Sequence, residues 1–309
     1  MTVLGIALVA PFIISAQNVN ILVLLYTFAV MAASWDLLYG FTGQVNFGPV
    51  VPYGVAGFLV GWMSRDTSIH PLIILPVAAL LATGMSVVLI GLPSLRLRVG
   101  YLAVVSLAST IVIQQIAVRF TGEEGISMIR PIFYDLKINY FASLTLLLVT
   151  VVVLLGLVNS RIGLHLKAVR EDELLAEALG VDVVRTKILA YTVSSLFTAF
   201  AGGFVAMFIQ HVDHLYFSIG TNFQVISMAI VGGLGTIIGP VIGTSILYYI
   251  LSVFISQGVI SQALNGVLMV LVIMLAPEGL YKLLRTLSSK ISKAITKATS
   301  TPNRPQQDK

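Results

Sequence analysis

Charged residues are scarce in this chain of 309 residues, and cysteine is absent. Asp, Glu, Lys and Arg make up only 10% of the sequence, whereas soluble domains carry roughly 25% charged residues. A soluble fold needs charge to cover its surface, so the composition excludes a soluble enzyme and a DNA-binding domain. The absence of cysteine excludes disulfide bonds, cysteine catalysis and thiolate metal sites.

The few charges are unevenly placed and leave long uncharged windows, of which residues 214–277 form the longest. A membrane-spanning helix needs about 20 predominantly apolar residues, so that window could hold three. Barrel strands would instead show short segments of alternating polarity. The pattern predicts an all-α polytopic membrane protein with about ten transmembrane helices. The expected spans cover residues 3–14, 19–39, 45–63, 71–92, 101–118, 141–160, 188–208, 224–238, 240–256 and 260–277.

Basic residues set the expected orientation. With both termini on one side of the membrane, that side holds 14 of the 18 Lys and Arg residues. Cytoplasmic connections carry an excess of Lys and Arg, so both termini are expected in the cytoplasm. Residues 1–280 form the expected transmembrane domain, and residues 281–309 a basic amphipathic helix followed by a disordered tail. That basic helix either lies on the inner leaflet or serves only to enforce the topology.

Motifs for catalysis are missing. The sequence contains no G-x-x-x-x-G-K-[ST] phosphate-binding loop and no His/Glu cluster with metal-ligand spacing. His211 and His214 flank Asp213, but two histidines in a polar loop are usually only part of that loop. The sequence therefore favours transport over catalysis.

The connection of residues 161–187 carries the strongest functional signal. Arg170-Glu171-Asp172-Glu173 precedes a short apolar run, and Gly180 stands where a helix would end. Acidic residues in a first turn complement the helix dipole. The pattern predicts a short amphipathic helix at the cytoplasmic surface. Such a helix either docks into a groove of another protein or belongs to an ordinary connecting loop.

Glycine and proline interrupt the helical pattern twice, in residues 40–49 and in residues 231–243. Broken helices are tolerated in a membrane only where protein or a water-filled cavity satisfies the freed backbone. Paired interruptions in the two halves of a transporter point to its transport site, and close packing through small residues is the alternative. Asp36 is the one acidic residue within an expected span. Its position beside Trp35 and Tyr39 favours an interfacial role over a transport role.

Five segments in order resemble a known family. Residues 39–48 resemble its G-x-x-G-Q-x-S-x-G stretch, and residues 95–103 its L-R-L-R-G-x-Y-x-A stretch. Residues 163–180 resemble its cytoplasmic coupling loop. Residues 231–240 resemble its G-G-x-G-x-x-x-G-P, and residues 277–280 its closing P-x-G-L. The chain is similar to the LivM-like permease subunit of branched-chain amino acid ABC importers.

The resemblance implies a partner set: a second related permease, two cytoplasmic ATPase subunits, and a periplasmic or extracellular substrate-binding protein. ATP would be hydrolysed by the partner subunits, and this chain would bind no cofactor or metal. The location would be the prokaryotic inner membrane. The implied ATPase-coupling residues are Arg170, Glu171, Asp172, Glu173, Ala176, Ala178 and Gly180. The implied substrate pathway contains Gly40, Gly43, Gln44, Asn46, Gly48, Tyr101, Ser106, Gly232, Gly233, Gly235, Gly239 and Pro240.

Departures from the family pattern leave the substrate open. Asn46 replaces the usual small hydroxyl residue, residues 49–54 replace a stretch that often begins with His, and Glu123-Glu124 stand in the outer turn. Branched-chain or other small amino acids are the expected cargo, and urea or short amides the alternative. An ion-coupled carrier would normally place acidic residues deep in its spans, where only Asp36 is available. An intramembrane enzyme would need a catalytic constellation that the spans do not offer.

Overall fold

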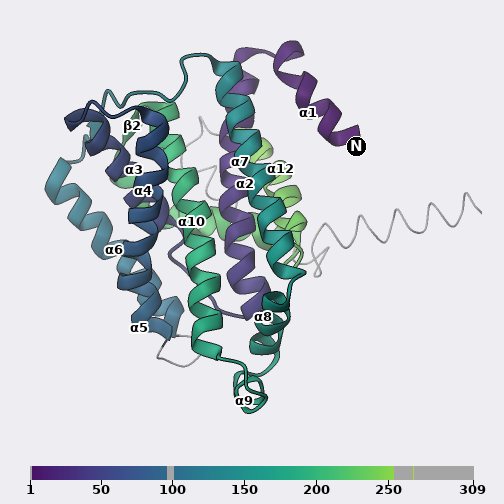
Figure 1. The fold of residues 1–309 in the computed structure, drawn as a ribbon. Helices are drawn as coiled ribbons and strands as arrows, with labels where there is room; N and C mark the ends of the chain where they lie inside the picture. Colours follow the sequence, from purple (N-terminus) through teal and green to yellow (C-terminus); the bar gives the residue numbers. More distant parts are fainter. Residues whose placement is uncertain (1, 96–100, 254–266, 268–309) are drawn as a thin grey trace, which may run out of the picture.

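The computed structural model describes residues 2–95, 101–253 and 267. The expected span over residues 260–277, the closing motif of residues 277–280 and the basic helix of residues 281–309 lie outside the described residues, as do Arg96 and Arg98. Within the described residues the chain is mostly helical, as the sequence predicted (Figure 1).

Five helical segments are long and apolar enough to cross a membrane. They confirm a polytopic helical membrane protein. The α4 segment continues through a π-helical turn, η1 (Val87–Gly91), and is followed by the short α5 (Leu92–Leu95). The five segments are α2 (Ala16–Thr42), α4 (Pro71–Ser86) with η1, α6 (Tyr101–Thr121), α7 (Leu136–Val158) and α10 (Val183–Ile209).

Four further helices overlap expected spans but are shorter, over the described residues, than the five segments above. They are α1 (Thr2–Ile13), α3 (Val50–Asp66), α11 (Ile219–Gly232) and α12 (Ile238–Val253). At 1.5 Å per residue α1, α3 and α11 reach about 18–26 Å, less than the roughly 30 Å of a bilayer core, and α12 is described only as far as Val253. The glycine-rich segments occupy the residues by which α3 and α11 fall short of the expected spans. Ten full-length spans are therefore not confirmed: among the described residues, only the five segments above have crossing length.

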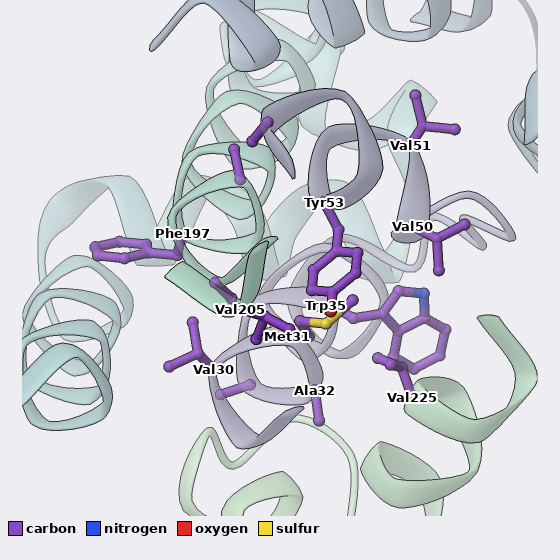
Figure 2. Packing of buried hydrophobic residues seen from close by; sticks show 14 of the residues in the cluster. Val30, Met31, Ala32, Trp35, Val50, Val51, Tyr53, Phe197, Val205 and Val225 are labelled. Atoms are coloured by element: carbon purple, nitrogen blue, oxygen red, sulfur yellow. The ribbon is translucent and has the colours of Figure 1, made fainter. Parts of the chain in front are cut away.

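The helix α2 lies at the centre of the bundle. It contacts α7, α10, α11 and α12, and small residues such as Ala29 and Ala33 are completely buried along it. Figure 2 shows Met31 and Trp35 of α2 packed beside Tyr53 of α3. Small side chains let helix backbones approach closely in membranes. Hence α2 places any break in its neighbours next to protein rather than lipid.

The two ends of the bundle carry different elements. At one end lie α8 (Arg161–Glu171) and α9 (Glu173–Ala178). At the opposite end β1 (Ile126–Ser127) pairs antiparallel with β2 (His211–Val212) (Figure 1). The 3₁₀ turn η2 (His214–Phe217) follows β2 and packs on α3, where the ring of Tyr216 stacks on that of Tyr53. The connection between α10 and α11 is thus partly inserted between helices rather than a free outer loop.

Candidate transport site and coupling surface

The first break, residues 43–49, separates α2 from α3. Gly43 ends α2 in the left-handed conformation (φ 71°), with its N–H donating to the oxygen of Tyr39. The irregular backbone beyond it is held by side chains. The indole N–H of Trp35 donates to the oxygen of Asn46 (2.7 Å), and the N–H of Phe47 donates to Oγ of Ser106 (2.9 Å). Protein groups thus satisfy backbone that a helix has released, as a membrane interior requires.

A polar stripe on α6, formed by Ser106 and Thr110, supports the other side of this break together with Asn222 of α11. Oδ1 of Asn222, at the start of α11, accepts from the N–H of Val50 (3.2 Å), and its Nδ2 donates to Oγ1 of Thr110 (3.4 Å). Ser106, Thr110 and Asn222 are all buried. Sequence reasoning missed Thr110 and Asn222. The spacing Ser106, Thr110, Gln114, each four residues apart on one face of an apolar helix, is the signal that could have found the stripe.

Gln44 is the member of the first break with an unused polar atom. Its side chain is buried, and its Oε1 has no hydrogen-bond partner among the described residues. Buried polar atoms are rarely left unpaired in folded proteins. An unpaired acceptor in an irregular segment is a candidate for contact with a transported molecule.

The second break, residues 233–237, separates α11 from α12. Gly233 (φ 112°) and Gly235 (φ 71°) adopt backbone conformations that favour glycine. Ile237 also has a positive φ of 57°, which is a strained conformation for a β-branched residue. Close packing holds the segment: a Cβ atom on Gly232 would overlap the oxygen of Gly239. Pro240 follows in the first turn of α12, where the missing N–H costs nothing.

Asp36 of α2 binds the second break. Its carboxylate accepts hydrogen bonds from the backbone N–H groups of Gly235 (2.7 Å), Thr236 (3.2 Å) and Ile237 (3.2 Å). The side chain is fully buried in protein. The adjacent aromatic residues suggested a role at the membrane interface; the structure shows that the carboxylate itself turns inward, where three freed N–H groups need an acceptor.

Gly40 allows this contact and faces the second break rather than the first. A Cβ atom at residue 40 would overlap Oδ1 of Asp36 and lie 2.5 Å from the nitrogen of Gly235. Tyr101 is an exposed residue at the start of α6. Of the expected pathway residues, Gly43, Gln44, Asn46, Gly48 and Ser106 meet at the first break. Gly40, Gly232, Gly233, Gly235, Gly239 and Pro240 meet at the second.

The coupling loop, residues 161–187, forms two helices before α10, not the single one expected. The carboxylate of Asp172 caps α9 by accepting from the N–H groups of Leu174 and Leu175. Gly180 (φ 86°) ends it: its N–H donates to Glu177, and the N–H of Val181 donates to Ala176. This pair of bonds is a Schellman motif, so Gly180 terminates the helix as the sequence indicated.

The exposed side of α9 is apolar. Leu174, Leu175 and Leu179 are 79%, 59% and 75% exposed. Ala178 is exposed as well, whereas Ala176 is buried against the chain. Ala176, one of the implied coupling residues, therefore does not contribute to the exposed face of α9. A protruding helix end with three exposed leucines is a surface suited to a groove on another protein.

Glu173 has an internal partner. Its carboxylate lies 2.5 Å from the ammonium group of Lys187, whose side chain is only 3% exposed. This ion pair ties α9 to the start of α10. Glu171 and Asp172 remain exposed at the surface.

Arg170 connects the coupling loop with both breaks. Its guanidinium donates to the backbone oxygen of Gly40. A Cβ atom at Gly235 would lie 3.2 Å from Nη1 of Arg170, and one at Gly43 would lie 3.6 Å from its Cγ. A single side chain at the end of α8 thus contacts residues beside both irregular segments.

Metal-ligating clusters are absent from the part of the chain that the structure describes. His211 is engaged locally, with Nδ1 3.0 Å from Oγ of Ser127 and Nε2 3.6 Å from Asp213. These contacts lie at the β1–β2 pair.

Comparison with known proteins agrees with these features. The family described as "Branched-chain amino acid transport system / permease component" matches residues 17–277. The chain therefore belongs to this family of membrane permeases, and the resemblance seen in the motifs is confirmed. No enzyme family is indicated.

Individual relatives extend over most of the chain. The high-affinity branched-chain amino acid transport system permease protein LivM of Salmonella typhimurium is 24% identical over 92% of this chain and 75% of its own length. LivM of Escherichia coli has the same values. LivH of Salmonella typhimurium is 24% identical over 82% of this chain and 91% of its own length. No solved structure shows a significant match.

Proposed function

We propose that the chain is the membrane-spanning subunit of an ATP-driven importer for branched-chain or other small amino acids. The observation that carries the mechanism is Arg170, which links the coupling loop to residues beside both breaks. A signal that arrives at α9 then has a direct route to irregular backbone inside the bundle. The breaks supply the substrate path.

The chemistry of the breaks suits a zwitterion with a small apolar side chain. Neutral polar groups surround the first break, including the unpaired Oε1 of Gln44 and the side chains of Asn46 and Ser106. The helices α3 and α12 begin directly after the two breaks, and helix N-termini favour a carboxylate. Tyr101, at the exposed start of α6, remains an expected pathway residue.

A second related permease fits the exposed side of α6. Tyr101, Val104 and Val112 are 56%, 68% and 56% exposed, and the polar Gln115 is exposed beside them. A glutamine facing lipid is costly, so a protein partner or an aqueous path is the better neighbour. Similarity to both LivM and LivH, two permease proteins of branched-chain amino acid transport systems, supports such a pair.

Two ATPase subunits would engage α9 and hydrolyse the ATP, since the sequence has no phosphate-binding loop. The end that carries α8 and α9 then faces the cytoplasm, in keeping with the basic residues Arg161, Lys167 and Arg185. The β1–β2 end faces a substrate-binding protein outside. Figure 1 shows the N-terminus far from α8 and α9, so a cytoplasmic N-terminus is not part of this proposal.

The two alternative functions are not equally supported by the structure. A urea or short-amide importer shares the architecture and differs only in cargo. An ion-coupled carrier is disfavoured because Asp36, the buried acid of the described spans, already accepts three backbone N–H groups. Such a carboxylate has little capacity left for a coupling ion.

The test is uptake by proteoliposomes that contain the chain with its partner permease, ATPases and binding protein. We expect ATP-dependent accumulation of radiolabelled leucine, isoleucine or valine, and none with the chain alone. Accumulation of urea or acetamide but not amino acids would favour the alternative cargo. Uptake by the chain alone, driven by an ion gradient, would contradict the importer.

A further inference from the structure

The last two turns of α2 bring two opposite charges next to the second break: Asp36 belongs to α2, and Arg170 contacts it. Asp36 holds the N–H groups of residues 235–237. One helical turn later, Gly40 presents its oxygen to Arg170. Gly235 lies between them, bonded to Asp36 through its nitrogen and close to Arg170. Arg170 is also the cation that interacts electrostatically with Asp36.

The segment held by Asp36 is strained. Three of its five residues have positive φ; the two glycines adopt this conformation without cost, so the strain lies at the β-branched Ile237. Strained backbone persists only where its surroundings hold it, and it tends to occur at switch regions. Asp36 supplies three of those holding contacts. Loss of these three hydrogen bonds would let residues 233–237 relax, and the position of α11 relative to α12 would then change.

Arg170 is placed to control the hydrogen bonds between Asp36 and the second break. It lies at the end of α8, two residues before Asp172, the residue that caps α9. Any displacement of α9 by a partner therefore acts on Arg170 through a short connection. A buried carboxylate that loses its neighbouring cation becomes costly, so withdrawal of Arg170 weakens the arrangement around Asp36.

We propose that Asp36 and Arg170 form a latch on the second break, in which Arg170 senses α9 and Asp36 positions residues 233–237. Both are positioning residues that act through this segment. In the resting state the latch keeps the segment in its strained form. When α9 moves, Arg170 leaves Gly40, Asp36 releases the segment, and the path opens. The identity of the partner that moves α9 rests on the proposed function; the latch itself does not.

The absence of cysteine makes a direct test available. A Leu234→Cys variant of the full chain in membranes places one thiol at a half-buried position within the second break. Its rate of reaction with a water-soluble maleimide then measures how often the segment opens. Asp36→Asn and Arg170→Gln are combined with this thiol. Lys167→Gln is the matched control, because it removes an exposed cation from the same helix.

We expect Asp36→Asn and Arg170→Gln each to raise the labelling rate by roughly tenfold, the scale expected when a hydrogen bond to a charged group is lost. Arg170→Lys should restore part of the protection, and Lys167→Gln should label at the parent rate. Equal rates in the parent and both latch variants would overturn the proposal. Equal acceleration by Lys167→Gln and Arg170→Gln would overturn it as well.

A nucleotide arm separates a latch from a purely structural contact. In the assembled complex, trapping with ATP and vanadate should raise the labelling rate of the parent and leave that of Arg170→Gln unchanged. If Asp36→Asn fails to accumulate in membranes, Arg170→Gln decides the result, because Arg170 lies at the surface. Absence of amino acid uptake by the parent complex would refute the proposed function, and the labelling difference between variants would still judge the latch.

Discussion

At the scale of single residues, Gly40 shows how one missing side chain permits a functional contact. A Cβ atom there would overlap Oδ1 of Asp36, so Gly40→Ala must displace the carboxylate from the second break. We expect a loss of about 1–3 kcal/mol of stability, typical of overpacking, and loss of uptake. Thermal unfolding of the purified chain and uptake normalised to membrane abundance measure the two effects.

Gly156 is the matched control for this substitution. It lies within α7, and a Cβ atom added there meets nothing within 4 Å. Gly156→Ala should therefore leave stability unchanged or raise it by about 0.5–1 kcal/mol, since alanine favours helix over glycine. Equal destabilisation by both substitutions would show that the contact between Asp36 and residues 233–237 is not what Gly40 protects.

At the scale of elements, the ion pair between Glu173 and Lys187 fixes α9 on α10. Glu173→Gln leaves the ammonium group of Lys187 buried without its partner. We expect a loss of about 3 kcal/mol, as for other buried pairs broken on one side. The double variant with Lys187→Met should recover most of it, because neither charge then remains. A double-mutant cycle on unfolding free energy measures the coupling, and additive losses would contradict it.

Because of this ion pair, Glu173 is a poor residue with which to test whether α9 docks on the ATPase subunits. Charge reversal at Glu173 would damage the fold as well as any interface. Leu174 is the sharper probe because its side chain is 79% exposed. We expect Leu174→Asp to abolish ATP-driven uptake while the chain keeps its unfolding temperature, and Leu174→Met to retain uptake. Full uptake by Leu174→Asp would show that α9 is not the contact with the ATPases.

Sequence patterns predicted the elements better than the contacts between them. Long uncharged windows predicted the spanning helices, and Gly43 and Gly233 marked the breaks, because both depend on local composition. The partners of Asp36 lie about 200 positions away, and no local pattern specifies them. Likewise, Lys187 gave no sign of being buried, since its pairing with Glu173 depends on how α9 folds back on α10.

At the scale of the whole molecule, the two breaks share one organising helix. Trp35 of α2 donates to the first break and Asp36, its neighbour, accepts from the second. Successive residues on a helix point about 100° apart, so α2 can hold two irregular segments on different sides at the same position along its axis. Arg170 contacts α2 one turn further on, at Gly40, and so joins the coupling loop to this part of the helix. The molecule thus concentrates its irregular backbone where a signal from α9 arrives.

The orientation of this arrangement in the membrane yields the last prediction. The side chains of Met128 and Leu174 are 92% and 79% exposed. Met128 directly follows β1 and Leu174 lies in α9, so the two residues stand at opposite ends of the bundle. Because the chain lacks cysteine, single thiols placed there report sidedness. In intact cells an impermeant maleimide should label Met128→Cys and leave Leu174→Cys unlabelled, and permeabilisation should expose the latter. Labelling of Leu174→Cys in intact cells would place α9 outside, beyond the reach of any cytoplasmic ATPase, and would remove the basis for ATP-driven coupling through Arg170.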